Sequence, residues 1–333
     1  MKKVGYLFSL LIICTIIILG IVFYLLLLPA SYSTNREFVI KTGESVNQIS
    51  QHLYDQGLVR SRFVFESYVW YKKLEKNFIA GTFIVEPGMN SLKLAGLFTS
   101  LENPNELTLQ FIEGWTIKDI QNYLLTNAFI KNKEEFEQYN QAGLWKKEFK
   151  FLESLPDGET LEGYLFPDTY KFFPNSTSQD VIRKMLKNFD DKLTAEMRVV
   201  IATRGLTIHN IVTLASILEK EVKTEKDMKL VADIFNRRMA IGMLLQADST
   251  LNYATGGRNA SLTTDELALD NPYNSYKYAG LPPTPISNSG LNALRAAVYP
   301  EINEYFFFLT SPEGETYYAK TLDEHNKNKQ YLK

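Results

Sequence analysis

Three segments of the chain repeat one order of positions: a short β-prone run, a turn with glycine, a polar residue two positions later, and apolar residues at helical spacing. The glycines and the polar residues that follow them are Gly43 and Ser45, Gly88 and Asn90, and Gly114 and Thr116. Each copy predicts a strand followed by a helix, because a Ser, Asn or Thr side chain can accept a hydrogen bond from a free amide of the first helical turn.

A further helix is predicted over residues 63–74, between the first two copies. Its side chains available for packing are Phe65, Tyr68, Val69 and Tyr71. Together these segments predict a β-α-α-β module over residues 37–101, which resembles the LysM-like domains of cell-wall proteins. LysM domains often bind polymers of N-acetylglucosamine, but the same apolar spacing is needed simply to form a core. Glycan binding by the module therefore stays open.

The rest of the chain predicts a second domain over residues 105–333, after a polar linker at residues 101–106 that contains Pro104. Apolar periodicity predicts helices over residues 178–192, 195–203, 209–222 and 225–239. Two β-prone runs, residues 305–310 and 316–319, flank a Pro-Glu-Gly turn and predict a β-hairpin. The fold class is α+β and mainly helical.

Residues 4–28 contain no charged side chain and are mostly Leu, Ile, Val and Phe. As a helix this run is about 37 Å long, enough to span a hydrocarbon core of about 30 Å. A cleaved signal peptide has a shorter apolar run, so an uncleaved single-pass anchor is favoured. Lys2 and Lys3 place the short tail, residues 1–3, in the cytoplasm and the remainder outside the cytoplasmic membrane.

Composition excludes several kinds of partner and site. A net charge of −2 argues against nucleic acid, because phosphate contacts need clustered Lys and Arg. The one cysteine, Cys14, lies within the predicted anchor, so thiol catalysis outside the membrane is excluded. His52, His209 and His325 have no metal-ligand spacing, which argues against a catalytic zinc. His325 falls in a predicted closing helix and is interpreted as a structural hydrogen-bonding residue.

The helix over residues 209–222 carries two candidate catalytic carboxyl groups. Its buried stripe is predicted to consist of Ile211, Leu214, Ala215, Leu218 and Val222. At about 100° per residue, Glu219 lies about 80° to one side of the stripe and Glu221 about 80° to the other, while Lys220 points to solvent. Both glutamates are therefore boundary residues, which on most helices are simply surface residues.

The end of this helix distinguishes the two glutamates. Thr224 and Asp227 resemble a capping box for a new helix, so the earlier helix is expected to end near Val222 or Lys223. Glu221 then lies in the last turn, where the negative end of the helix dipole raises the pKa of a carboxyl group. A general acid needs a raised pKa.

Polar and aromatic residues in three later segments, which are expected to be loops, suit a groove for a neutral, hydroxyl-rich polymer. The candidates for substrate binding are Gln246, Asp248, Ser249, Thr250, Tyr253, Tyr273, Asn274 and Tyr276, together with Glu162. The alternative for each is structural: tyrosines pack in cores, and polar side chains satisfy loop backbone. Residues 280–285 contain three prolines and predict a rigid wall beside these segments.

The motifs together resemble the endolytic murein transglycosylases, the MltG or YceG-like family. They include Ala215-Ser-Ile-Leu-Glu-Lys-Glu221, Phe235-Asn-Arg237, residues 242–250, Tyr273-Asn-Ser-Tyr276, Gly280-Leu-Pro-Pro283, residues 161–170, Glu113-Gly114 and His325-Asn326. The resemblance implies cleavage of peptidoglycan strands between N-acetylmuramic acid and N-acetylglucosamine at the outer face of the cytoplasmic membrane. It also implies that the enzyme ends strand elongation beside peptidoglycan synthases, without a cofactor.

The resemblance assigns the catalytic acid to Glu221. Soluble lytic transglycosylases place their glutamate four residues after an apolar helix position and before a small hydroxyl residue; Ile217 and Glu221 match the offset, whereas Val222 departs from the pattern. Glu219 is the alternative, or a supporting group. The implied reaction uses one carboxyl group to form a 1,6-anhydro ring on the muramic acid, and no water is consumed.

Two rival functions stay open. A hydrolytic muramidase would need a second carboxylate about 5–5.5 Å away if retaining, or about 6.5–9.5 Å away if inverting. Asp248, Glu162 and Asp168 are the candidates for that group. A membrane-tethered peptidoglycan-binding scaffold would keep the aromatic residues, but it would not need a carboxylic acid at the end of a helix.

Overall fold

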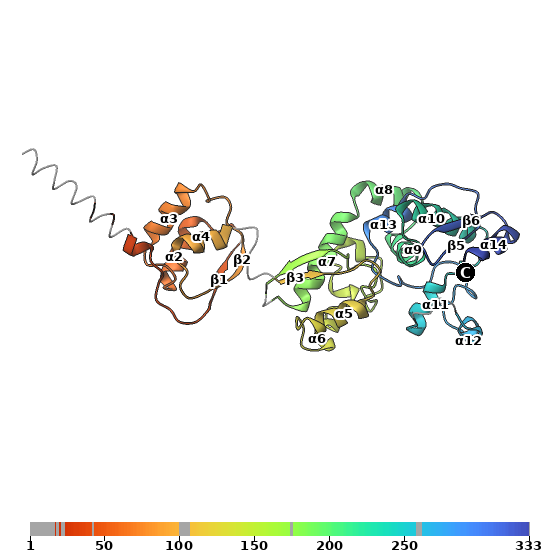
Figure 1. The fold of residues 1–333 in the computed structure, drawn as a ribbon, viewed down its shortest axis with the longest axis horizontal. Helices are drawn as coiled ribbons and strands as arrows, with labels where there is room; N and C mark the ends of the chain where they lie inside the picture. Colours follow the sequence, from red (N-terminus) through yellow and green to blue (C-terminus); the bar gives the residue numbers. More distant parts are fainter. Residues whose placement is uncertain are drawn as a thin grey trace, which may run out of the picture. The chain divides into compact units, whose positions relative to one another are not determined.

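The computed structural model describes residues 24–41, 43–99, 107–173, 176–257 and 262–332, together with Ile17 and Gly20. The chain divides into two compact units, Met1–Leu107 with Lys171–Asn175, and Thr108–Tyr170 with Ser176–Lys333. Both contain helices and strands, and each sheet has two strands, pairing β1 with β2, β3 with β4, and β5 with β6. The predicted mixed class, mostly helical with small sheets, is confirmed (Figure 1).

The first unit has the predicted order of two strands and two helices, followed by one more helix. Its elements are β1 (Arg36–Ile40), α2 (Val46–Asp55), α3 (Arg62–Tyr71), β2 (Gly81–Val85) and α4 (Ser91–Thr99). Strands β1 and β2 are antiparallel, with Phe38 opposite Phe83. Both rings contact Phe98 of α4, at centroid distances of 5.3 and 5.0 Å, so the sheet and α4 share one core.

One prediction for α3 is wrong. Phe65 and Val69 are buried in the core of the first unit as expected, but Tyr71 is 80% exposed. The helix ends at Tyr71, and two residues of helical rotation turn its side chain about 200° away from Val69. Val64 points within about 20° of the same direction and is buried, so the exposure of Tyr71 goes with its place at the end of the helix.

The predicted strand–turn–helix repeats are confirmed at all three positions. Ser45 accepts from the amide of Gln48 at the start of α2, Asn90 accepts from Lys93 over 2.9 Å in α4, and Thr116 caps α5 (Ile117–Thr126). The three turn glycines have φ between 79° and 85°, the left-handed region that glycine adopts without a Cβ penalty. One local pattern thus builds parts of both units.

The remaining elements follow from Leu107 onward. They are β3 (Leu107–Gln110), α6 (Lys133–Glu137), β4 (Thr169–Phe172), α7 (Ser178–Lys192), α8 (Ala195–Thr203), α9 (Ile208–Glu221), α10 (Glu225–Ala240), α11 (Asp248–Thr255), α12 (Thr264–Ala268), α13 (Leu291–Val298), β5 (Phe307–Thr310), β6 (Thr316–Ala319) and α14 (Leu322–Asn328), with short 3-10 turns at Ala142–Leu144, Lys150–Leu152 and Lys329–Leu332. The predicted helices over residues 178–239 and the antiparallel hairpin are confirmed. Helices α11 and α13 were not predicted.

Helix α9 lies at the centre of the second unit, packed against α10 and α13 (Figure 1). The predicted stripe is buried. The remaining residues between Ile211 and Leu218 are buried too, because helices cover α9 on more than one side. The helix ends at Glu221, as expected, because Val222 is extended (φ −143°, ψ 155°). Thr224 then caps α10 by accepting from the amide of Asp227.

Within the described ranges, no single helix is long and apolar enough to cross a membrane. Most of the predicted anchor, residues 4–28, and the predicted linker, residues 101–106, lie outside the described residues.

Candidate active site

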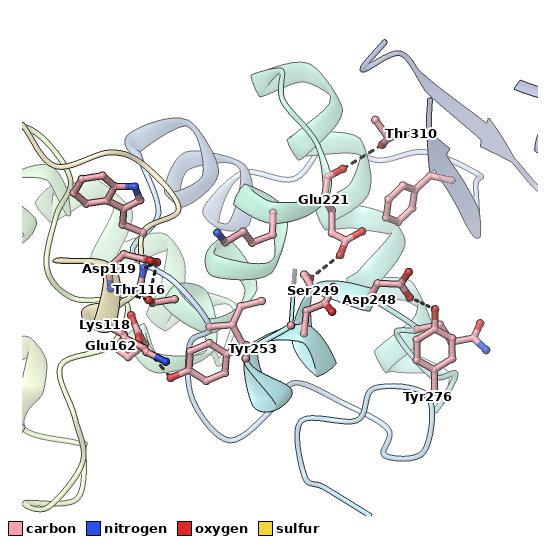
Figure 2. Close-up of a pocket in the computed structure, with 18 of the residues that line it drawn as sticks. Thr116, Lys118, Asp119, Glu162, Glu221, Asp248, Ser249, Tyr253, Tyr276 and Thr310 are labelled. Carbon is pink, nitrogen blue, oxygen red and sulfur yellow. Dashed lines mark hydrogen bonds between the residues drawn. The ribbon is translucent and has the colours of Figure 1, made fainter. Parts of the chain in front are cut away.

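A cleft of about 1420 Å³ in the second unit is lined by segments that lie far apart in the sequence. Its walls come from residues 115–119 before and within α5, Glu162, the end of α9, Gln246, one side of α11, Tyr276, strand β5 and helix α14. Figure 2 shows several of these side chains converging on one open space. Within the described ranges, no three His, Cys, Asp or Glu side chains lie together as metal ligands would.

Glu221, the last residue of α9, directs its carboxyl group into this cleft (Figure 2). The Ser249 hydroxyl, from the first turn of α11, donates a hydrogen bond to Glu221 Oε1 over 2.6 Å. The backbone oxygen of Glu221 accepts from Thr310 Oγ1 on β5 over 3.1 Å. Two other elements therefore fix both the side chain and the end of the helix that carries it.

The protonated form of Glu221 is favoured by its surroundings. Burial raises the pKa of the carboxyl group, the hydrogen bond from Ser249 lowers it, and the negative charge of Asp248 raises it. The predicted direction is thus confirmed, but the leading cause is loss of solvent rather than the helix dipole. Asp248 itself accepts a short hydrogen bond from the Tyr276 hydroxyl, which holds its carboxylate beside Glu221 (Figure 2).

Glu162 is a second carboxyl group of the cleft, and only 4% of it is exposed. It accepts from the amide of Ile117 over 3.1 Å, from Asn288 Nδ2 over 3.0 Å and from the Tyr253 hydroxyl over 3.4 Å. Burial nevertheless raises the pKa of Glu162 to about 8. The group therefore links three segments of the cleft wall at the first turn of α5.

The turn after Glu162 depends on a glycine that no other residue can replace without strain. Gly163 has φ +88°, and a Cβ atom there would lie 2.5 Å from Pro285 Cβ and 2.8 Å from Val212 Cγ1. Because of this close approach, the turn packs directly against α9. Asn288, which was not predicted as a site residue, ties the turn down by accepting from the amide of Leu165 over 2.9 Å.

Glu219, the alternative catalytic residue, does not line the cleft. Its Oε2 accepts from the amide of Gly290 over 2.9 Å, and Gly290 is the N-cap of α13. Burial raises the pKa of Glu219 to about 7, and the nearby Glu113 charge adds to the rise. A carboxylate at a helix N-terminus stabilises that helix. The geometry therefore gives Glu219 a structural contact with α13.

Most of the predicted substrate-binding residues line the cleft: Gln246, Asp248, Ser249, Tyr253, Tyr276 and Glu162. Gln246 has a positive φ of 53° without being glycine. Such strained backbone persists only where the surroundings enforce it, and it clusters at functional sites. Asp248 and Ser249 lie in the first turn of α11 rather than in the predicted loop.

Three predicted substrate-binding residues lie off the cleft. Thr250 is fully buried and its hydroxyl donates to the Ala247 oxygen over 2.9 Å. Asn274 is also fully buried and donates to two backbone oxygens between α12 and the following loop. The Tyr273 hydroxyl bonds to Thr284, and the Tyr273 ring contacts the ring of Tyr253, at 5.3 Å between centroids. These side chains satisfy internal polar groups, the structural alternative considered for each.

Sequence reasoning missed the cations of the cleft and misjudged one histidine. Lys118, Lys220, Arg238 and Lys329 line the cleft, although their spacing along the chain gives no common signal. His325 was interpreted as a structural hydrogen-bonding residue, but its Nδ1 is buried without a hydrogen-bond partner among the described residues, and it lines the cleft. The His325-Asn326 motif was a usable signal for this placement. Asp168, a candidate second carboxylate, does not line the cleft and accepts from Asn188.

Glu162 gives the second unit a pH-dependent stability. Its folded pKa of about 8 exceeds the ordinary value of 4.5, so the folded protein binds more protons between these pH values, and stability falls as the pH rises through them. Glu162→Gln keeps an oxygen for Ile117 and Asn288 but cannot ionise. Between pH 5 and pH 8.5 the free energy of unfolding of the wild type should fall by several kcal/mol more than that of this variant, at about 1.4 kcal/mol per pKa unit.

Chemical denaturation across this pH range measures the effect. The control is Glu153→Gln, which removes an exposed carboxylate nine residues away and should leave the wild-type slope unchanged. Equal slopes for the wild type and Glu162→Gln would mean that Glu162 is ionised in the folded protein at neutral pH.

Comparison with known proteins agrees with the family expected from the motifs. The family model described as the YceG-like family matches residues 38–331. A Bacillus subtilis (strain 168) protein named endolytic murein transglycosylase is 31% identical over 309 residues, covering 87% of this chain and 83% of that protein. A Streptococcus pneumoniae protein of the same name is 30% identical over 316 residues, covering 87% of this chain and 57% of that protein.

A solved structure supports the same assignment. The crystal structure of a putative yceG-like protein from Listeria monocytogenes is similar to this chain with a TM-score of 0.61 and 31% sequence identity. The similarity covers 89% of this chain and 99% of the Listeria chain. With the family match extending over nearly all of the sequence, the chain belongs to the YceG-like family.

Proposed function

We propose that this protein is a membrane-anchored lytic transglycosylase that cleaves the bond between N-acetylmuramic acid and N-acetylglucosamine within peptidoglycan strands. The observation that carries the proposal is Glu221, a carboxyl group with a raised pKa held by Ser249 in a long polar cleft. The names of the similar Bacillus and Streptococcus proteins support the substrate. The cleaving activity is assigned to residues 105–333, because all of the cleft lies there.

The reaction begins with proton donation by Glu221. Ser249 donates to Oε1, which leaves Oε2 to carry the proton to the glycosidic oxygen. The bond between C1 of the muramic acid and that oxygen breaks, and positive charge develops on C1. The Ser249 hydrogen bond then stabilises the carboxylate that remains, because a donor to the charged form favours it.

The second step returns the proton. The Glu221 carboxylate accepts the proton of the C6 hydroxyl of the same sugar while that oxygen bonds to C1. A 1,6-anhydro ring forms, the acid is regenerated, and no water enters. Tyr253 and Tyr276 line the cleft, and both hydroxyls donate to carboxyl groups, so the two rings are held in place where sugars can contact them.

The location proposed for this activity is the outer face of the cytoplasmic membrane, where the enzyme would end the elongation of new strands beside peptidoglycan synthases. Its support is the uncharged run at residues 4–28 preceded by Lys2 and Lys3. In this arrangement the first unit, whose order of elements resembles LysM-like domains, holds the catalytic unit close to the membrane.

Mass analysis of the products from purified glycan strands in ¹⁸O-labelled water tests the proposed chemistry. The new ends are expected to be 1,6-anhydromuramic acid without ¹⁸O. Reducing ends that carry ¹⁸O would identify a hydrolase instead, with Asp248 or Glu162 of the same cleft as its second carboxylate. Binding of strands without any cleavage would identify a scaffold.

A further inference from the structure

Helix α3 has three exposed aromatic side chains. Phe63 is 68% exposed, Trp70 48% and Tyr71 80%. Phe63 and Trp70 are seven residues apart, so their directions differ by only about 20° around the helix, and Tyr71 lies about 80° from Phe63. Phe65 and Val69 are buried on the opposite side of α3. Val64 is also buried and points within about 20° of Tyr71, which lies seven residues later at the end of the helix. These three exposed rings form an aromatic face.

Basic residues are frequent in and beside α3 in the sequence. Residues 60–76 contain five cations, Arg60, Arg62, Lys72, Lys73 and Lys76, against the two carboxylates Glu66 and Glu75, a net charge of +3. One carboxylate, Glu66, is already paired with Arg62 over 3.4 Å. The Nζ atom of Lys72 lies 5.6 Å from the centre of the Tyr71 ring, so cation and aromatic surface are adjacent at the end of α3. This combination suits an anionic, partly apolar surface.

The chain leaves its long uncharged run directly beside α3. The carbonyl oxygen of Pro29, the first residue after that run, accepts from Arg60 Nε over 2.9 Å. Ser61, the next residue after Arg60, is the N-cap of α3. The Tyr32 hydroxyl donates to the backbone oxygen of Glu86 over 2.8 Å, so the segment just after Pro29 is also bound to the first unit. Figure 1 shows the red segment before Pro29 next to this unit.

We propose that α3 docks on the outer surface of the membrane, with the aromatic face at the boundary between lipid headgroups and acyl chains and the surrounding cations on anionic phospholipid headgroups. The proposal rests on the anchor included in the proposed function. Trp and Tyr are enriched at this boundary because one end of each ring system is apolar and the other polar. Basic residues near an anionic lipid surface are attracted to it. A neutral glycan would gain little from the five cations.

Labelling at single cysteines tests the docking, because Cys14 is the only native cysteine. In a Cys14→Ser background, nitroxide labels are placed by Phe63→Cys, Tyr71→Cys or, as control, Val39→Cys. Val39 of β1 is 48% exposed, the same fraction as Trp70, but lies outside α3. The full chain is reconstituted in vesicles of phosphatidylcholine and phosphatidylglycerol. Accessibility to oxygen and to a water-soluble nickel chelate then reports the depth of each label.

Side chains of interfacial helices are buried about 5–10 Å, so the ratio of oxygen to nickel accessibility at residues 63 and 71 should exceed that at residue 39 by at least about threefold. Lys72→Glu with Lys76→Glu should reduce the ratio on anionic vesicles. Equal ratios at all three positions would overturn the docking. Labels that respond to added glycan strands but not to lipid would overturn it too, in favour of a sugar platform. Vesicle flotation reports the anchor separately, so a failed anchor and a failed docking are distinguishable.

Discussion

Glu221→Gln is expected to lower the rate of strand cleavage by about 10²–10⁴, the usual contribution of general acid–base catalysis. The amide has the shape of the carboxylic acid, and its oxygen can still accept from Ser249, so the end of α9 should keep its structure. It cannot donate a proton to the glycosidic oxygen and recover one from the C6 hydroxyl. The rate of appearance of anhydromuropeptides, measured by mass spectrometry, gives the loss, and thermal unfolding checks that the fold is kept.

Glu219→Gln is the matched control on the same helix. Its side-chain oxygen can still accept from the amide of Gly290, so activity should stay within about threefold of wild type, a difference of about 0.7 kcal/mol. Near-normal cleavage by Glu221→Gln would contradict the proposed mechanism and move the proton donor to Asp248 or Glu162. A large loss in Glu219→Gln alone would exchange the roles of the two glutamates.

Gly163→Ala is expected to lower the stability of the second unit strongly. The new Cβ would lie 2.5 Å from Pro285, whose ring cannot move aside easily, and the backbone is in the left-handed region. Overpacking and positive φ together cost about 2–4 kcal/mol, which lowers the melting temperature of a unit of this size by about 5–15 °C. Calorimetry or circular dichroism measures the change.

Gly158→Ala is the control for this substitution. Gly158 lies in the preceding turn, its φ is not in the left-handed region, and no atom lies within 4 Å of an added Cβ. The melting temperature of the Gly158→Ala variant should stay close to that of the wild type. If Gly163→Ala melted no earlier than Gly158→Ala, the close packing of the Glu162 turn against Pro285 and α9 would be wrong.

Local patterns in the sequence were enough to predict most elements correctly. Ser45, Thr116 and Thr224 each cap the helix expected of them, because a capping hydrogen bond involves only residues three apart. The ends of α7 and α8 were likewise predictable from apolar periodicity and polar flanks. Helix α11 was missed because its first residues, which include Asp248 and Ser249, looked like a polar loop.

Tertiary contacts decided what periodicity could not. Glu219 and Glu221 lie at equal angles from the buried stripe, and their difference arises from the elements that reach them: α13 approaches one and α11 the other. Thr250 and Asn274 have side chains equally suited to binding sugars and to satisfying internal backbone groups. Only the fold shows that theirs are used internally.

The order of the cleft segments along the chain has a consequence for synthesis and export. Strand β5, whose Thr310 bonds to the backbone of Glu221, and the last cleft residues, Leu322, His325 and Lys329, follow every other part of the cleft in sequence. In a chain that emerges amino terminus first, Glu221 therefore appears long before the segments that complete the cleft. At the location outside the cytoplasmic membrane proposed above, an unfinished chain in the translocation channel would thus be inert towards the cell wall, and activity would begin only after the last wall of the cleft has been delivered.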